Sequence, residues 1–431
     1  MELTRRYFLK SSGALAAYLG VAPLTALAGG VRIRKQPVAK GKTLVVIFLR
    51  GGADGLNLVV PFGDPHYRRL RPSLAIASPG VDAGAIDLDG HFGLHPRLAP
   101  LKGLFDENLV VAAHAVGYSR NTRSHFEEQD TWETGVIGNT VNSDGWLNRH
   151  LATSEGRGPI RAVSIGDSLP RILHGKAPAY AIRGLSDLTL PAGAGDPARI
   201  AAALEHAYSC DGCREASAAR DLLAQTATTT LDGIEQLRGV VGEEYVAAAE
   251  YPQTETARRL REVARLIKAG VGLEVAEVDL GGWDTHADQG QAGGGQLGNL
   301  AGELAGAMAA FMRDLGERTE DVVVVTMTDF GRTAEENGTR GTDHGWANAM
   351  LLAGGPVWRA NRAAESAGAP RKVAGMWPGL APDQLHEGRD LLHTTDFRDV
   401  IGELVSVHLG NPNIQAVLPS HEFRAVGLVA G

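Results

Sequence analysis

Short runs of apolar residues, many of them β-branched, alternate along this chain with segments that have apolar residues at helical spacing. Such runs are typical of buried strands, and their alternation with helices predicts an α/β fold: a mostly parallel central sheet with helices on both faces. The expected strands are residues 43–49, 109–115, 161–165, 273–280, 322–327 and 350–353. A final helix is expected over residues 396–409.

One part of the chain departs from this alternation. Between about residues 190 and 270 the composition shifts to Ala, Glu, Arg and Leu, so we expect a helical insertion there. Glycine and proline concentrate in residues 290–298 and 354–378, which we interpret as loops. The predicted organisation is one domain over residues 43–431, with the insertion inside it.

The first 28 residues have the order of features that an export signal requires. The pair Arg5 and Arg6 lies in a charged stretch, a small apolar stretch follows, and residues 26–28 read Ala-Leu-Ala, a cleavage signal. This order predicts a twin-arginine signal peptide over residues 1–28 and a linker over 29–42, rather than an ordinary N-terminal helix. The expected partner is therefore the twin-arginine (Tat) translocase, and the expected location is periplasmic or secreted. Because this route carries folded proteins, often with a metal already bound, the signal also favours a metal site.

Charge and hydropathy exclude two classes of function. The chain has 42 Lys plus Arg against 50 Asp plus Glu, and its one basic block is residues 32–35, so we expect no nucleic-acid partner. After the signal, no apolar run approaches the ~18 residues of a membrane-spanning helix, so we expect no span in the mature chain. Cys210 and Cys213 form a C-x-x-C, for which we expect a local disulfide rather than a redox or zinc site.

Aspartate and histidine residues follow the ends of three predicted strands. They are Asp54 in Gly-Gly-Ala-Asp, Asp284 and His286 in Gly-Gly-Trp-Asp-Thr-His, Asp329 in Thr-Asp-Phe-Gly, and Asp343 with His344 in Gly-Thr-Asp-His-Gly. In an open α/β sheet, ligands bind outside the carboxyl ends of the strands, so these side chains are expected to converge on one site. Each signal alone is weak, since an aspartate after a strand often only forms a turn. Together they predict one or two divalent ions, and carboxylate with imidazole suits Zn²⁺, Mn²⁺ or Mg²⁺.

Five strings carry a specific resemblance. They are LRGGADGLN from residue 49, TRSHF from 122, GGWDTHADQ from 281, TDFGRTAEENG from 328 and GTDHG from 341. These strings resemble the exported family known as domain of unknown function 1501, within the alkaline phosphatase and sulfatase-like superfamily. The resemblance implies an alkaline-phosphatase-like fold and a metal-dependent hydrolase of phosphate or sulfate esters, with a small molecule or glycan carrying the ester.

The resemblance also implies a set of metal ligands. One metal would be held by Asp284, His286 and His344, and a second by Asp54 and Asp329. The chain departs from the superfamily pattern at one position. In the superfamily, the aspartate that corresponds to Asp329 is followed directly by a histidine ligand, whereas this chain has Phe330 at that place. Asp343 and His125 remain open as substitute ligands.

Enzymes of the superfamily use a hydroxyl or a modified cysteine at a helix start as the nucleophile. In this chain the matching interval lies between residues 114 and 132. Ser124 is the first choice because acidic residues three and four positions on indicate a helix start. A plain N-cap residue is the alternative interpretation of Ser124. Ser119 and Thr122 are the alternatives. Arg123 is the expected clamp for the ester's anionic oxygens.

Two other functions are kept as alternatives. Ser168 lies in Gly-Asp-Ser-Leu, the nucleophile block of GDSL esterases, and Asp390 and His393 have the spacing of their Asp-x-x-His. A serine esterase would leave the strand-end carboxylates and histidines unexplained. A non-catalytic, metal-stabilised periplasmic scaffold or assembly factor is the other alternative, and Phe330 in a ligand position favours it.

Overall fold

The computed structural model describes residues 41–138, 143–156, 160–185, 237, 240, 244–291 and 294–431. The expected signal peptide, both cysteines and most of the expected helical insertion lie outside these residues. The chain divides into two compact units, one of residues 1–38 and 182–245 and one of residues 39–181 and 246–431. The candidate site lies entirely in the second unit. Among the described helices, none combines the length and the apolar character that crossing a bilayer requires.

The described residues contain a nine-stranded sheet. Its order is β11 (Val373–Ala374), β5 (Val110–Gly117), β10 (Asn348–Gly354), β9 (Val322–Thr328), β1 (Thr43–Leu49), β8 (Val275–Leu280), β6 (Ala162–Ile165) and β7 (Tyr180–Ile182), with β12 (Thr395–Asp396) beside β5. The six strands expected from the sequence are all present, with ends within two residues of those expected. β1 pairs in parallel with β8 and β9, and β6 with β8, whereas β10 is antiparallel to both of its neighbours. The sheet is therefore mostly parallel, as predicted.

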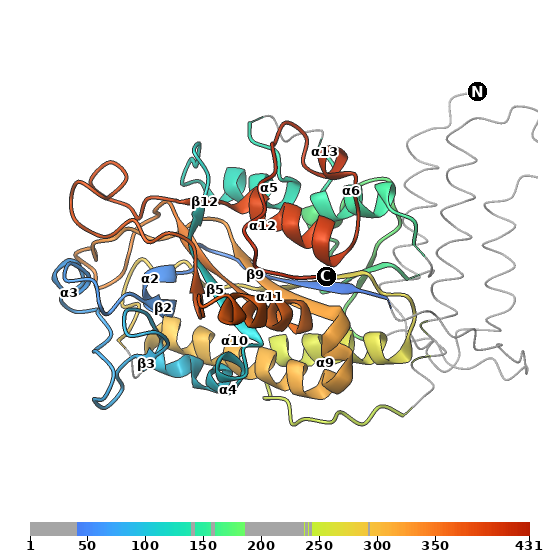
Figure 1. Cartoon of the computed structure of the whole chain (residues 1–431), viewed down its shortest axis with the longest axis horizontal. Helices are drawn as coiled ribbons and strands as arrows, with labels where there is room; N and C mark the ends of the chain where they lie inside the picture. Colours follow the sequence, from blue (N-terminus) through green and yellow to red (C-terminus); the bar gives the residue numbers. More distant parts are fainter. Residues whose placement is uncertain are drawn as a thin grey trace, which may run out of the picture. The chain divides into compact units, whose positions relative to one another are not determined.

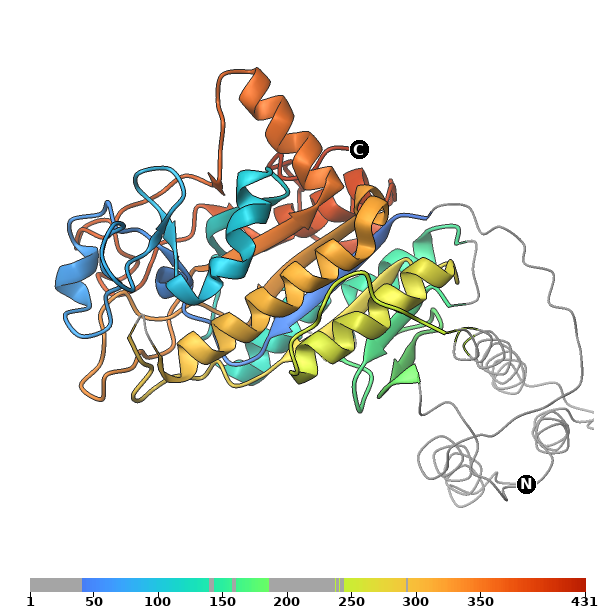
Figure 2. The same ribbon diagram turned by 90° about the horizontal axis from the view of Figure 1, so that it is seen from below.

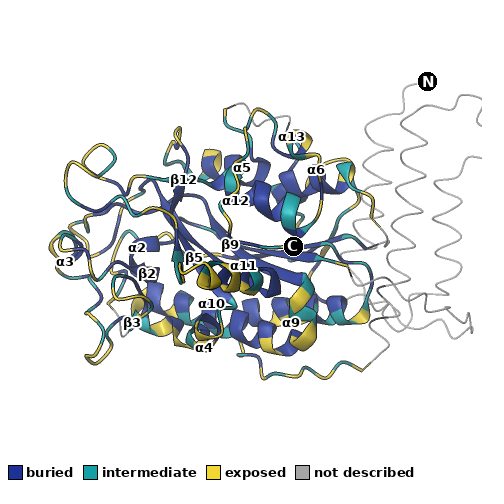
Figure 3. Cartoon of the chain, in the orientation of Figure 1, coloured by how far each residue is buried: buried dark blue, intermediate teal, exposed yellow. Residues whose placement is uncertain are grey.

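Helices cover both faces of this sheet (Figures 1 and 2). α9 (Glu255–Ala269) and α10 (Gly295–Leu315) lie on one face, and α5 (His125–Thr134), α6 (Trp146–Thr153) and α12 (Phe397–Glu403) lie on the other. Figure 3 shows that these helices bury the side that faces the sheet, while exposed residues lie on the outer side. This layering explains the uninterrupted apolar sequence of β1, in which all seven residues are buried.

Shorter elements complete the described chain. The other helices are α2 (Gly55–Leu58), α3 (Tyr67–Leu70), α4 (Lys102–Asp106), α11 (Gly355–Ser366) and α13 (Ile414–Val417), with 3₁₀ turns at Pro96–Leu101, Arg171–Leu173 and Gly316–Asp321. A small second sheet has the order β2 (Val59–Val60), β4 (Gly93–Leu94) and β3 (Ile86–Asp87). The expected last helix begins after Asp396, whose side chain accepts from the N–H of Arg398, and continues as a π-helical turn at Leu404–His408.

The register of the central strands brings their ends to one level. Leu49, the last residue of β1, pairs with Leu280 of β8 and with Thr328 of β9. Because β10 runs antiparallel to β9, the loop that leaves β9 returns to the same edge before β10 begins. The loops after β1, β8 and β9 and the loop before β10 therefore meet at this edge of the sheet, which we call the carboxyl edge.

Candidate metal centre

A glycine turn at the end of β1 holds Asp329. Gly51 and Gly52 have φ angles of 117° and 74°, in the range that side chains disfavour. Their two N–H groups donate to Oδ1 of Asp329 over 3.0 and 2.7 Å. A Cβ atom on Gly52 would lie 2.5 Å from Cε2 of Phe330. Glycine is needed here both for the turn and for the close approach of the backbone to the loop after β9.

Three histidine side chains are oriented by a hydrogen bond at Nδ1. His125, the first residue of α5, lies with Nδ1 2.6 Å from Oδ2 of Asp329. Nδ1 of His286 lies 3.1 Å from Oδ1 of Asp343, and Nδ1 of His344 lies 2.8 Å from the carbonyl oxygen of Arg123. Because each partner is an ionised carboxylate or a carbonyl, Nδ1 carries the proton and donates. In the neutral ring the lone pair is then on Nε2, the arrangement found in metal-binding histidines.

The three Nε2 atoms converge on the carboxylate of Asp284. Oδ1 of Asp284 lies 3.1 Å from Nε2 of His286, 3.2 Å from Nε2 of His344 and 3.4 Å from Nε2 of His125. The Nε2 atoms of His286 and His344 are 2.9 Å apart. Ligand atoms around a tetrahedral Zn²⁺ with bonds of about 2.0 Å are about 3.3 Å apart, close to these separations. We call His125, Asp284, His286 and His344 the cluster.

Burial and hydrogen bonding set the protonation of the cluster. Burial would raise the pKa of Asp284, but the hydrogen bond and charge of Arg332 outweigh it and the pKa is lowered. For His344, burial disfavours the charged ring and so lowers its pKa, which favours the neutral ring. The hydrogen bond to Asp329 raises the pKa of His125. Two facing Nε2 lone pairs repel each other unless a cation lies between them. The donor set, one carboxylate with three imidazoles, fits a divalent ion such as Zn²⁺.

Arg332 contacts the cluster and was not among the residues that the sequence analysis selected. Its buried guanidinium donates to Oδ1 of Asp284 over 2.7 Å, to the carbonyl of Gly52 over 2.6 Å and to the carbonyl of Thr342 over 3.0 Å. It therefore fixes the loops after β1 and β8 and the loop before β10 to one another. Its signal in the sequence was its place inside TDFGRT, between two candidate ligand segments.

Asp54 lies in a different environment from the cluster. It is fully buried, and its Oδ2 accepts from Nη1 of Arg71 over 2.5 Å and from Nε2 of Gln289 over 2.7 Å. Arg71 is also fully buried and donates further to the carbonyls of Thr333 and Ala334. The structure thus places Asp54 in a buried ion pair, and it places His125 in the cluster together with Asp284.

Asp329 contacts the cluster through hydrogen bonds. Its side chain is fully buried. Oδ2 accepts hydrogen bonds from His125 and, over 3.2 Å, from Nε2 of Gln129, while Oδ1 accepts from the N–H groups of the glycine turn. Phe330, next in the chain, is buried with its ring centroid 4.7 Å from that of His125 and 4.5 Å from that of His344. The two aspartates predicted to hold a second metal, Asp54 and Asp329, thus both accept hydrogen bonds from protein groups, and the aromatic ring of Phe330 follows Asp329.

The candidate nucleophiles lie just before α5. Ser124 is the N-cap residue of this helix, and its hydroxyl makes no capping hydrogen bond. Its neighbour His125 belongs to the cluster, so Ser124 is one residue from the convergent donor atoms. Oγ1 of Thr122 donates to Glu128 over 2.9 Å, and Ser119 is exposed. Ser124 is thus the candidate hydroxyl whose position in the chain keeps it next to the cluster.

Arg123 has two contacts that the sequence did not suggest. Its guanidinium donates to Oδ2 of Asp390 over 2.7 Å and to Glu387 over 2.7 Å, so acidic residues already neutralise it. Its backbone has a φ of 60° and presents the carbonyl oxygen to His344. The structure therefore gives Arg123 a role in orienting a cluster histidine.

The residues of the esterase alternative have other partners. Asp390 binds Arg123 and Arg389, and Nδ1 of His393 accepts from Nε1 of Trp346 over 3.0 Å. Ser168 lies after β6, in a cleft lined by β8, α9 and α10. Among the described residues no hydrogen bond joins Ser168, His393 and Asp390 into a catalytic triad.

A family model for a protein of unknown function, DUF1501, matches residues 118–411, which include the whole cluster. The chain belongs to this family. The match confirms the resemblance to this family, and four of the five sequence strings lie within the matched residues, whereas the string from residue 49 lies before them. The sequence has no match among curated proteins.

Solved structures with a similar chain path were also found. One is the C-terminal periplasmic domain of EcEptC from Escherichia coli in complex with Zn, at 10% identity and a TM-score of 0.36, covering 77% of this chain and 78% of that one. Another is the PsFucS1 sulfatase from Pseudoalteromonas sp., at 11% identity and a TM-score of 0.32, covering 81% of this chain and 65% of that one.

Proposed function

We propose that the chain is an exported hydrolase of phosphate or sulfate esters that uses a divalent metal ion held by the cluster. The observation that carries the proposal is the convergence of three histidine Nε2 atoms and Oδ1 of Asp284, with every histidine oriented by a hydrogen bond at Nδ1. The ester class follows from the sequence strings that resemble the alkaline phosphatase and sulfatase-like superfamily.

The ion's chemistry and the residues around it suit an anionic ester. A divalent ion bound by the cluster would neutralise charge on the ester and make a nearby water or hydroxyl easier to deprotonate. The N-terminus of α5, at His125, contributes N–H groups without intrahelical partners and the positive end of the helix dipole. Ser124 at this terminus is the proposed nucleophile. Asp329 holds the ring of His125 in place, and Arg332 does the same for Asp284.

The twin-arginine signal is part of the same proposal. The paired Arg5 and Arg6, the apolar stretch and the cleavage signal support export of the folded chain to the periplasm. Fractionation of cells that express the full chain tests this. An Arg5→Lys, Arg6→Lys variant should remain in the cytoplasm with its signal uncleaved. Equal export of the variant and the native chain would contradict the assignment.

A non-catalytic scaffold is the second candidate, and one observation favours it. The buried ring of Phe330 packs against both His125 and His344, so an apolar surface adjoins the cluster where the superfamily pattern has another ligand. A scaffold of this kind would bind the metal for stability and turn over no ester.

Metal content and ester turnover, measured on the same preparations, test both candidates. The mature chain should contain about one equivalent of a divalent ion by plasma mass spectrometry. Asp284→Ala and His344→Ala should each lose it, whereas His174→Ala, at an exposed site, should keep it. Turnover of p-nitrophenyl phosphate or sulfate that disappears with the metal supports the hydrolase. Metal without turnover of any ester supports the scaffold, and absence of metal refutes the centre.

A further inference from the structure

Three polar residues of α5 face the carboxyl edge at intervals of about one helical turn. His125, Gln129 and Glu133 are four residues apart, so they lie on one face of the helix. His125 contacts Asp329, which follows β9, and Glu133 pairs with Arg50, which follows β1. Gln129, between them, contacts both Asp329 and Arg50. Its side chain therefore joins the ends of two neighbouring strands beside the cluster.

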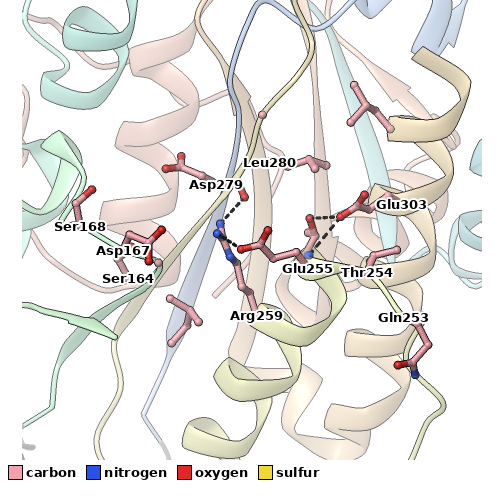
Figure 4. Close-up of a pocket in the computed structure, with 15 residues that line it drawn as sticks. Ser164, Asp167, Ser168, Gln253, Thr254, Glu255, Arg259, Asp279, Leu280 and Glu303 are labelled. Carbon is pink, nitrogen blue, oxygen red and sulfur yellow. Dashed lines mark hydrogen bonds and ion pairs between the residues drawn. The ribbon is translucent and has the colours of Figure 1, made fainter. Parts of the chain in front are cut away.

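Two carboxylates hold Arg50 in place. Its Nη1 and Nη2 donate to the two oxygens of Glu133 over 2.8 and 3.1 Å, and its Nε donates to Oδ1 of Asp279 over 2.6 Å. Asp279 lines the cleft between β8, α9 and α10, where its carbonyl oxygen accepts from Arg259 (Figure 4). The guanidinium of Arg50 thus has a fixed position at the end of β1. From there its Nη1 reaches Oε1 of Gln129 over 3.3 Å.

The charge of Arg50 determines which way the amide of Gln129 points. A guanidinium can only donate hydrogen bonds, and an ionised carboxylate can only accept them. Oε1 of Gln129 therefore faces Nη1 of Arg50, and Nε2 faces Oδ2 of Asp329, 3.2 Å away. The flipped amide would place its NH₂ group against the guanidinium and its oxygen against the carboxylate, and both contacts would be repulsive. Arg50 thus makes Gln129 a donor to Asp329.

Gln129 completes the set of donors around Asp329. Oδ1 of this buried carboxylate accepts from the N–H groups of Gly51 and Gly52, and Oδ2 accepts from Gln129 and from Nδ1 of His125. Four donors occupy about as many lone-pair positions as a carboxylate has. Two donors on each oxygen fix the plane of the carboxylate. Without Gln129, the imidazole would be the single partner of Oδ2 among the described residues, and carboxylate and ring would be free to move together.

We propose that Gln129, oriented by Arg50, is a positioning residue of the metal centre: by fixing Oδ2 of Asp329 it sets the direction in which His125 presents Nε2 to the ion. The inference rests on the proposed function only in that the cluster binds a divalent ion. Gln129 acts through Asp329 and His125 and is not a ligand itself. Hydrogen-bonding partners that orient a metal ligand typically contribute about 10–100-fold to metal affinity, and a factor in this range is expected for Gln129.

Co²⁺ titration of the metal-free mature chain at pH 7.5, followed by visible absorbance, measures the dissociation constant (Kd) of the ion without any substrate. Gln129→Met keeps the length of the side chain and removes the donor, so Kd should rise about tenfold or more. Gln415→Met, at an exposed position of α13, is the matched control and should leave Kd unchanged.

Gln129→Glu separates positioning from mere support of α5. Arg50 keeps the introduced carboxyl ionised, so this variant strengthens the contact with Arg50 but places a carboxylate against Asp329. Positioning through Asp329 predicts that Kd rises at least as much as in Gln129→Met. If Gln129 only fastened the helix to Arg50, Kd would stay at the native value, and the inference would be overturned.

A double-mutant cycle with His125→Ala shows whether Gln129 acts through that histidine. In the His125→Ala background, Gln129→Met should raise Kd by less than about twofold further, because the ring that it positions is absent. A full tenfold rise in both backgrounds would overturn the positioning role. If His125→Ala binds no Co²⁺, the result for Gln129→Glu decides alone.

Failure of the inference and failure of the proposed function give different results. Native Kd values for both variants at position 129 would overturn the positioning role and leave the metal centre in place. A native chain that binds no Co²⁺ would refute the metal centre, and with it both the proposed function and the role of Gln129.

Discussion

Replacing Asp54 separates a structural role from a metal-binding role. In the structure Oδ2 of Asp54 is bound by Arg71 and Gln289, both within 2.7 Å, while its Oδ1 has no hydrogen-bond partner. If Asp54 serves the fold, Asp54→Asn removes the counter-charge of a fully buried guanidinium. The guanidinium of Arg71 stays buried away from water, because it also donates to Asn57 and to backbone carbonyls.

The expected cost follows from this geometry. Breaking a buried ion pair by removing one partner costs about 3–5 kcal/mol. In a cooperative unit of about 330 residues, that corresponds to a fall in Tm of about 4–7 °C. Metal content should be unchanged, because the cluster is formed by other residues. Asp106→Asn, which removes an exposed partner of Lys102, is the matched control and should cost less than about 1 kcal/mol.

Calorimetry and plasma mass spectrometry on the same samples check this prediction. A Tm within about 1 °C of the native value, together with loss of a metal equivalent, would show that Asp54 is a ligand and that the reasoning from Arg71 is wrong. A large fall in Tm with full metal content would assign Asp54 to the fold. The unpartnered Oδ1 is the atom that a metal would use in the first case.

Two further predictions concern buried groups. Burial lowers the pKa of His95, His114 and His408 to about 4. Between about pH 6.5 and 4 the unfolded chain therefore binds more protons than the folded chain. The free energy of unfolding should fall as the pH decreases through that window, by about 1.4 kcal/mol per pH unit for each histidine. Urea unfolding at pH 7, 6 and 5 should show this fall, His408→Gln should make it shallower, and an unchanged slope would contradict the assignment. Gly52→Ala should reduce Tm and metal content together, because its Cβ would lie 2.5 Å from a buried aromatic carbon. Gly90→Ala, with a similar φ of 82° and open space around it, should cost only about 1–2 kcal/mol and keep the metal; equal effects of the two changes would show that backbone strain alone is responsible.

The strands could be predicted from the sequence because their signal is local. Six of the seven residues of Val322–Thr328 are β-branched and all seven are buried, which is typical of a strand covered on both faces of its sheet. The glycine and aspartate residues that follow these runs also indicated the carboxyl edge as the place of the site. Asp284, His286 and His344, predicted to share one metal, lie together in the structure. Their assignment as ligands remains a prediction.

The membership of the cluster depended on contacts between distant segments. Asp54 and His125 were both candidates, and nothing near either residue in the sequence distinguishes them. Arg71 lies 17 residues from Asp54 and binds it only because the chain after β2 folds back over the glycine turn. His125 reaches Asp329, 204 residues away, because α5 begins at the carboxyl edge.

The sequence by itself determined the α/β class, the positions of the strands and the loops that carry the candidate chemistry, because periodicity, glycine turns and strand ends are properties of neighbouring residues. Only the tertiary structure decided that Asp54 pairs with Arg71, that Arg123 offers its carbonyl rather than its guanidinium, and that Arg332 fixes three loops. Those outcomes depend on which charged groups become buried side by side. Burial makes an unpaired charge costly, so each such group takes the partner that the fold brings within reach, however distant in sequence.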